Sequence, residues 1–148
     1  MIRESQPSDI PQITKLGHQM YMQSIYSKWP WDWEKAHSMA SRYTKDDDKL
    51  LLCFYKSDML AGFLFANLCT HFYGSTKQAT QQLFYIHPLH RGGTAAVRMM
   101  KKFEHWGRYN DCDNLCFSQS SEGADDRWHK FCQNLGYVHV GATFFKEL

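Results

Sequence analysis

Apolar residues near the start of the chain recur at helical spacing. Between residues 10 and 21 they return every three to four positions, which is typical of a helix that buries one face. Ser8 stands just before this stripe, where its hydroxyl can cap the helix. A second helix is expected over residues 32–43, with Asp32 as its cap. Residues 2–4 are expected to form a short opening strand.

The middle of the chain changes to the pattern of strands. Residues 49–55 form an apolar run that is too short for a helix, and residues 59–70 continue as a second apolar run after a turn. These two runs predict a hairpin, with Gly62 as a possible bulge. Residues 71–78 read as a polar loop, and residues 81–87 as a third strand that ends before a proline.

A third helix is expected after the glycine pair at residues 92–93. A strand over 115–118, a helix over 125–134 and a closing strand over 138–145 complete the pattern. The expected order is β-α-α-β-β-β-α-β-α-β, an α/β class with a mixed sheet and helices packed on it, in one domain over residues 1–148. The apolar residues that the third helix turns inward are Ala96, Met99, Met100, Phe103 and Trp106.

Composition narrows the class of protein. The 148 residues include 17 Lys and Arg against 15 Asp and Glu, and a net charge of +2 argues against a dedicated nucleic-acid or anionic-membrane binder. No apolar run approaches the ~20 residues of a membrane span, and the N-terminus lacks a signal-peptide pattern, so a cytoplasmic location is expected. The five cysteines contain no C-x-x-C pair and favour free thiols over a metal site.

The most informative stretch runs from residue 83 to residue 96. A strand leads into a loop with Arg91, Gly92 and Gly93, and the loop leads directly into a helix that begins with small residues. A helix N-terminus presents unpaired N–H groups and the positive end of the helix dipole, which favours an anion such as phosphate. The alternative is an ordinary strand–turn–helix connection, because glycine pairs are common at turns.

Two motifs resemble the GNAT-type N-acetyltransferase superfamily. Pro88 and Arg91-Gly92 fall where that family has P-x-x-R-G, within an R/Q-x-x-G-x-G/A loop, although Thr94 stands where glycine is usual. Residues 131–137 resemble the family's F-Y-x-x-L-G-F/Y motif. The resemblance implies a GNAT-like fold, and acetyl-CoA (coenzyme A) as co-substrate without a metal. The residues implied to bind it are Phe84, Tyr85, Ile86, Arg91, Gly92, Gly93, Thr94, Ala95 and Ala96.

The resemblance leaves the proton-transfer groups open. Cys132 occupies the position of the family's tyrosine and could protonate the leaving thiolate, but it could also merely pack, with Tyr137 or water as donor. Glu122 is a candidate base, or only a surface turn charge. The titratable candidates beside it are His71, Tyr73, Tyr85 and His87.

Aromatic residues cluster between the first two expected helices, where the resembling fold places its acceptor-binding segment. They could form the wall of an amine site, a dimer contact or a local core. The residues expected to bind the acceptor are Tyr26, Trp29, Trp31 and Tyr73.

The function expected is acetyl-CoA-dependent acetylation of a primary amine on a small molecule or peptide, by direct attack on the thioester. No nucleic-acid or membrane partner is expected, and a homodimer is possible. The alternative is a catalytically silent coenzyme A-binding module of the same fold, because Cys132 replaces a tyrosine and Gln81 and Gln82 stand where carboxylates would serve. A third hypothesis is nucleic-acid binding through Lys101, Lys102 and Arg108. It is weaker, because these charges are expected on the solvent-exposed face of a helix.

Overall fold

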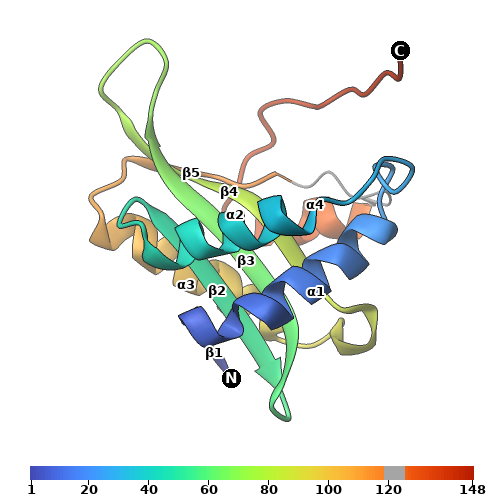
Figure 1. Ribbon diagram of the computed structural model, residues 1–148. Coiled ribbons are helices and arrows are strands. Elements are labelled where there is room, and N and C mark those ends of the chain that lie inside the picture. The colour runs from blue at the N-terminus through green and yellow to red at the C-terminus, as the bar shows by residue number, and fades with distance from the viewer. Residues whose placement is uncertain (119–125) are drawn as a thin grey trace. The chain divides into compact units, whose positions relative to one another are not determined.

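The computed structural model describes residues 1–118 and 126–148 (Figure 1). The chain divides into two compact units, Met1–Ser118 and Gln119–Leu148, and each is described by itself. The organisation of residues 1–148 as one domain stays a prediction.

The first unit is built on a five-stranded sheet with the strands in chain order. Neighbouring strands are antiparallel except β4 and β5, which are parallel, so the predicted mixed sheet is confirmed. The strands are β1 (Ile2–Glu4), β2 (Lys49–Lys56), β3 (Met59–Thr70), β4 (Lys77–Ile86) and β5 (Asn114–Cys116).

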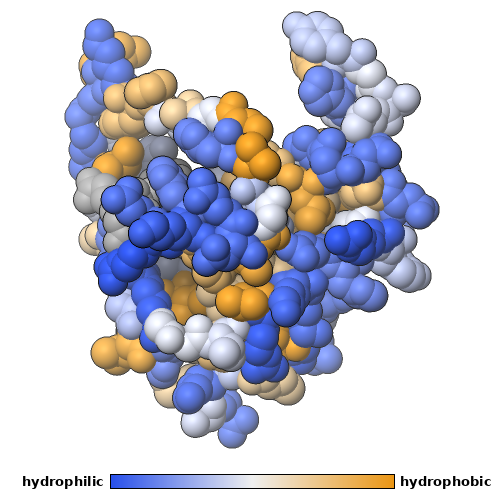
Figure 2. Space-filling model, turned by 180° about the vertical axis from the view of Figure 1, so that it is seen from behind, coloured by the Kyte–Doolittle hydropathy of each residue, from blue (hydrophilic) through white to orange (hydrophobic). Residues whose placement is uncertain are grey.

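Helices cover both faces of this sheet. Figure 1 shows α1 (Ile10–Met22) and α2 (Trp33–Lys45) in front of it, while α3 (Ala95–Tyr109) lies behind. One core lies between α1, α2 and the sheet, around Ile13, Leu51 and Phe63. The second core lies between α3 and the sheet, around Leu64, Met99 and Phe103. The outer surface over α3 is hydrophilic (Figure 2), as expected for its exposed Arg and Lys residues.

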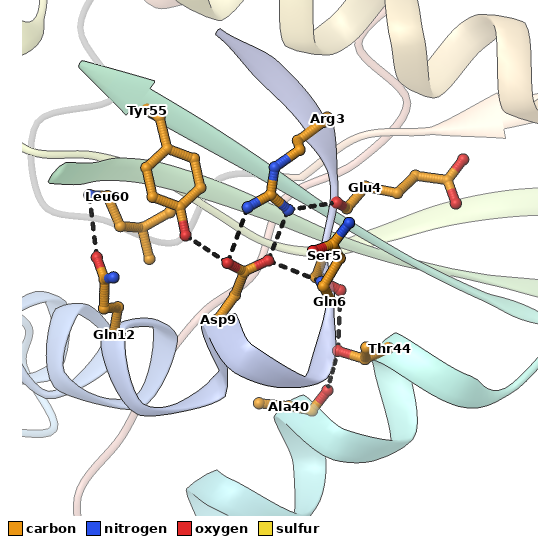
Figure 3. A network of polar contacts seen from close by, with 10 residues as sticks. All are labelled: Arg3, Glu4, Ser5, Gln6, Asp9, Gln12, Ala40, Thr44, Tyr55 and Leu60. Carbon is orange, nitrogen blue, oxygen red and sulfur yellow. Dashed lines mark hydrogen bonds and ion pairs between the residues drawn. The ribbon is translucent and has the colours of Figure 1, made fainter. Parts of the chain in front are cut away.

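A buried carboxylate ties the chain's first strand to the start of α1 (Figure 3). Asp9 ends the 3₁₀ turn η1 (Pro7–Asp9), and its side chain accepts two hydrogen bonds from Arg3, at 2.6 and 2.9 Å. It accepts two more, from the Tyr55 hydroxyl at 2.6 Å and the Gln6 backbone N–H at 2.7 Å. The prediction that Ser8 caps α1 was wrong, because Ser8 lies inside this turn and Asp9 is the cap position.

Other element boundaries follow the sequence pattern. Residues 2–4 and 59–70 form strands over the expected ranges, and the Asp32 side chain accepts a hydrogen bond from the Lys35 N–H at 2.9 Å as the predicted cap of α2. The third strand begins at Lys77 rather than at residue 81. Residues 77–80 pair with β3, and the buried Ala79 alternates there with half-buried polar neighbours.

The second unit contains α4 (Asp126–Asn134), which ends in a glycine cap. Gly136 has a φ of +86°, and the Tyr137 N–H donates to the Cys132 carbonyl at 3.0 Å, as in a Schellman motif. The predicted closing strand is not formed: residues 138–145 belong to no strand. A strand needs a neighbour to pair its backbone groups, and none is paired with this segment among the described residues.

Candidate active site

Strands β4 and β5 run side by side for only three residues and then separate. The pairs run from Gln78 with Asn114 to Thr80 with Cys116, while β4 continues to Ile86. At the point of separation the Gln81 side chain, which is 3% exposed, accepts a hydrogen bond from the Ser118 N–H at 3.0 Å. Within the described part of the chain, the edge of β4 that faces β5 is therefore open after Gln81.

A bulge in β4 lies at the same point. Phe65 pairs with Leu83 but Ala66 pairs with Gln81, so Gln82 has no opposite residue on β3. The extra residue reverses which side chains face the α3 core, from Ala79 before the bulge to Phe84 after it. The bulge thus turns the backbone of β4 where its edge becomes open.

The side chains of residues 84–86, which were predicted to bind the co-substrate, pack into the cores on the two faces of the sheet. Tyr85 is buried on the α1 side, and its hydroxyl donates to Gln23 Oε1 at 3.1 Å. Ile86 is buried on the α3 side, and the ring of the half-buried Phe84 lies 5.5 Å from that of Phe117. Only the backbone of these residues is offered at the open edge, which is the role that the resemblance implies for them.

The open edge leads through η2 (Pro88–His90) into the glycine loop and α3. Gly92 has a φ of +84°, in the left-handed region that favours glycine. A Cβ added at Gly92 or Gly93 would meet no atom of the described residues within 4 Å. Thr94 is the cap residue of α3, but its side chain makes no capping hydrogen bond. The first turn of α3 therefore presents its N–H groups beside a loop that leaves room for a ligand.

Arg91 connects the loop to the end of β4. Its Nε donates to the Ile86 carbonyl at 2.7 Å, and its guanidinium lies 5.6 Å from the centre of the Tyr85 ring. The sequence predicted a positive charge beside the phosphates. The structure adds that this charge is anchored to the strand, so strand edge and loop form one continuous surface.

The aromatic residues between α1 and α2 pack on α1. The Trp31 ring lies 5.5 Å from His18 and 5.1 Å from Tyr21, and a Cβ at Gly17 would contact it at 3.6 Å. The buried Trp31 Nε1 has no hydrogen-bond partner among the described residues. Trp31 thus has a packing role, while an acceptor-binding role stays a prediction.

Two other predicted acceptor residues in this segment lie at the surface. Tyr26 is 40% exposed and Trp29 is 38% exposed, with their ring centres 6.0 Å apart. The ammonium of Lys28 lies 4.9 Å over the Trp29 ring. The Trp29 ring therefore already accepts a cation from its own chain.

Tyr73 is not beside the opening between β4 and β5. It lies at the tip of the hairpin between β3 and β4, 88% exposed, with its ring 4.8 Å from that of Phe72. Figure 1 shows this hairpin projecting from the sheet. The tip precedes β4, whereas the opening begins after Gln81, so the early start of β4 carries Tyr73 away from the site.

The predicted proton-transfer residues belong to the second unit or lie outside the described residues. Cys132 is half-buried on α4, and burial raises the pKa of its thiol, which keeps it protonated at neutral pH. Tyr137 follows the glycine that ends α4. Glu122 lies outside the described residues.

The structural role of Gln81 was missed in the sequence. There it was noted only because a glutamine stands where a carboxylate base would serve. A polar side chain at a strand position expected to be buried could have indicated a buried hydrogen bond, such as the one from the Ser118 N–H.

Two further structural findings bear on the class of protein. No helix in residues 1–118 or 126–148 is long and apolar enough to cross a membrane. Over the same residues, no three His, Cys, Asp or Glu side chains are grouped to hold a metal ion.

The chain is similar to known proteins in its fold but not in its sequence. The chain matches no protein-family model and no curated protein sequence. Solved structures resemble it over its full length. Aminoglycoside N-acetyltransferase AAC(6')-Iy in complex with CoA is 14% identical, with 100% of this chain and 98% of that chain covered and a TM-score of 0.76. The same enzyme with a bisubstrate analog is 17% identical, with coverages of 100% and 97% and a TM-score of 0.78.

A third similar structure is ribosomal-protein-alanine N-acetyltransferase from Brucella melitensis. It is 14% identical, with 100% of this chain and 99% of that chain covered and a TM-score of 0.70. The chain has the GNAT fold. The predicted GNAT-like architecture is thereby confirmed, and at 14–17% identity the likeness establishes the fold alone. In the GNAT fold of this chain, the opening between β4 and β5 and the glycine loop are continuous, which makes this region the candidate active site.

Proposed function

We propose that this protein is an acetyl-CoA-dependent N-acetyltransferase that acts on the primary amine of a small molecule. The observation that carries the proposal is the open edge of β4, which continues into a glycine loop and an uncapped helix N-terminus. N-acetyltransferases with the same fold support it, including one that was crystallised with CoA.

The co-substrate fits this surface. The pantetheine arm carries amide groups, which can pair with the backbone of residues 84–86 as an added strand would. The pyrophosphate can bind the N–H groups of residues 92–96, because the Thr94 side chain does not cap the helix and no atom of residues 1–118 or 126–148 fills the space beside the two glycines. Arg91, anchored to β4, supplies a positive charge next to it.

The reaction is a direct transfer from sulfur to nitrogen. The lone pair of a neutral amine attacks the thioester carbonyl carbon, a C–N bond forms, the C–S bond breaks, and the amine loses a proton while the thiolate of coenzyme A gains one. Cys132 is proposed as the donor, because it occupies the position of the family's tyrosine in the motif over residues 131–137 and its thiol carries a proton at neutral pH. Tyr137 or water is the alternative donor, and Glu122 is proposed as the base.

The acceptor is proposed to lie against Tyr26, Trp29 and Trp31. Aromatic faces attract cations, and the position of Lys28 over Trp29 supports this affinity within the chain itself. An acceptor with a second, charged amine could take the place of the Lys28 ammonium. A cytoplasmic location and the absence of nucleic-acid and membrane partners remain predictions from the sequence.

One observation favours the second candidate, a catalytically silent coenzyme A-binding module. Both glutamines at the β4 bulge are engaged as amides, Gln81 with the Ser118 N–H and Gln82 with the Asn67 side chain at 2.7 Å. The bulge therefore holds no carboxylate base.

Release of coenzyme A from acetyl-CoA distinguishes the two candidate functions. It is measured with an aminoglycoside, small monoamines and a peptide with a free N-terminus as acceptors. Turnover with any acceptor removes the silent module, and binding of coenzyme A without turnover on the whole panel removes the transferase.

The first prediction tests the loop directly. Gly92→Val places a β-branched side chain at a φ of +84° and at the proposed pyrophosphate site. Several hydrogen bonds to a charged group are worth ~1–3 kcal/mol each, so the Kd for coenzyme A should rise at least about tenfold in calorimetry. Gly74→Val is the matched control, since Gly74 lies at the hairpin tip with no atom within 4 Å of an added Cβ. A folded Gly92→Val variant with unchanged affinity would remove the assignment of the loop.

A further inference from the structure

The opening between β4 and β5 is closed at its inner end by a side chain. The two strands are paired as far as Thr80 and Cys116, and the next residue of β4, Gln81, reaches across to the chain that follows β5. Its Oε1 accepts a hydrogen bond from the Ser118 N–H at 3.0 Å, as a backbone carbonyl would in a longer ladder. One glutamine side chain and one hydrogen bond therefore span the gap at this point.

The sheet around Gln81 leaves no space behind it. Gln81 pairs with Ala66 on β3, so the two side chains lie on the same face of the sheet, the face covered by α3. Ala66 and Ala79 are both fully buried there. On the same face, the rings of Phe84 and Phe117 meet beside the opening, 5.5 Å apart. Among the described residues, a group that enters the opening from its outer end can advance as far as Gln81 and no further.

The binding mode proposed above determines which part of coenzyme A meets Gln81. The pyrophosphate is assigned to residues 92–96 and the pantetheine arm to residues 84–86, so the arm runs along β4 towards the bulge. Three residues of strand separate Phe84 from Gln81, a length of roughly 10 Å. This length has to hold the end of the arm, the sulfur and the acyl group. The acyl group is therefore the part of the ligand that lies against Gln81.

We propose that Gln81 is the specificity-determining residue for the acyl donor, because it closes the acyl pocket and limits the transferred group to acetyl. The inference rests on the coenzyme A binding mode of the proposed function. A longer acyl chain would have to displace the Gln81 side chain from the Ser118 N–H. That displacement leaves polar groups without partners at a buried position, which is unfavourable. Longer acyl groups therefore bind less tightly instead of pushing a mobile side chain aside.

Binding of acyl-CoA thioesters to the full chain tests this role. In calorimetry without an acceptor, the parent should bind acetyl-CoA at least about tenfold more tightly than butyryl-CoA, since a single misfitting methylene already changes recognition by about 10–200-fold. Gln81→Ala removes the side chain that closes the pocket and should reduce this preference to within about threefold. Gln81→Asn, which is one methylene shorter, should admit propionyl-CoA and still exclude butyryl-CoA.

Two control variants separate the role of Gln81 from general damage to the bulge. Gln81→Glu keeps the length of the side chain and an acceptor for the Ser118 N–H, so it should keep the preference for acetyl-CoA. Gln82→Ala removes the neighbouring glutamine, which is exposed and donates from Nε2 to Asn67 Oδ1 at 2.7 Å, and should leave the preference unchanged. Circular dichroism checks that each variant is folded, and Gln81→Asn provides the test if Gln81→Ala is not.

The outcome for Gln81 is distinguishable from the outcome for the proposed function. A parent that binds acetyl-CoA and butyryl-CoA equally well overturns the role of Gln81, whether or not it acetylates an amine. A folded Gln81→Ala variant that keeps the full preference overturns it too. A preference that Gln81→Ala abolishes supports the role of Gln81, and if no amine of the acceptor panel is then acetylated, only the transferase is removed. A chain that binds no coenzyme A thioester removes both.

Discussion

Cys132 is the residue whose chemistry differs most from the resembling family. Its thiol is half-buried, and burial raises its pKa, so the protonated form that a donor needs predominates at neutral pH. A donor to a leaving thiolate acts only in the transition state.

If Cys132 is the donor, Cys132→Ala should lower kcat about tenfold or more while both KM values change little. Cys132→Ser, which keeps an O–H of similar size, should recover part of the activity. Cys69→Ala is the control, because Cys69 is a half-buried thiol on β3 that contacts Thr80 at 3.4 Å. Full kcat in Cys132→Ala would assign the proton to Tyr137 or to water.

The residues of the loop show what a sequence can and cannot predict at this scale. The glycine pair and Arg91 were recognisable because backbone curvature and charge depend on residue type. The anchoring of Arg91 to the Ile86 carbonyl depends on where β4 ends in space, so no local pattern could indicate it. The structural role of Gln81 depends in the same way on Ser118, which lies 37 residues later.

At the scale of elements, β3 and β4 approach each other closely just where β4 has its open edge. A Cβ at Gly62 would lie 2.8 Å from the Tyr85 carbonyl oxygen and 3.2 Å from Ile86 Cγ1. Both atoms belong to the part of β4 that we assign to the pantetheine arm. Glycine at this position therefore sets the path of the site's own strand.

Gly62→Ala should destabilise the protein by about 1–3 kcal/mol, because backbone must move to relieve the contact. It should also weaken coenzyme A binding several-fold. Urea unfolding and calorimetry measure the two effects. In Gly74→Ala the added methyl meets no atom within 4 Å, so stability should stay within ~0.5 kcal/mol of the parent. Unchanged stability and affinity in Gly62→Ala would show that the two strands can separate without cost.

The accuracy of the element predictions followed the strength of the local signal. The boundaries of β3 were predicted correctly because its apolar run is continuous. The start of β4 was missed because Gln78 and Thr80 place polar side chains on a strand face that the helices leave half-buried. The closing strand was predicted from a valid pattern, but pairing depends on a partner strand, and no local sequence specifies where that partner lies.

At the scale of the whole molecule, the sequence contained enough to predict a mixed sheet with helices packed on it, because two motifs at the right separation agreed with the order of elements. What holds the first strand to this sheet was not predictable in the same way. Arg3, Asp9 and Tyr55 are brought together from β1, η1 and β2 (Figure 3). Asp9 and Tyr55, which share a hydrogen bond, are 46 residues apart, so no local pattern reveals the network.

This network makes stability depend on acid pH. The Arg3 guanidinium, followed by the Tyr55 hydroxyl and the Gln6 N–H, holds the pKa of Asp9 well below its usual range. The unfolded carboxyl titrates near ~3.9, so at lower pH the unfolded chain binds a proton that the native state does not. The stabilisation is therefore complete above about pH 4 and is lost as the pH falls towards the native pKa, at up to about 1.4 kcal/mol per pH unit.

Asp9→Asn removes this titration and leaves Arg3 without its partner. Since Arg3 keeps 29% of its side chain exposed and Asp9 only 5%, the variant should lose about 2–3 kcal/mol at pH 7, somewhat less than a fully buried pair. The difference from the parent should shrink as the pH falls below 4, measured by urea unfolding from pH 7 to pH 2. Asp46→Asn, whose carboxylate is 41% exposed and lies 3.7 Å from Arg42, should change stability by less than ~1 kcal/mol throughout. A difference between parent and Asp9→Asn that stays constant down to pH 2 would contradict the network's role, because an ionised Asp9 must then contribute no more to the folded state than a neutral one.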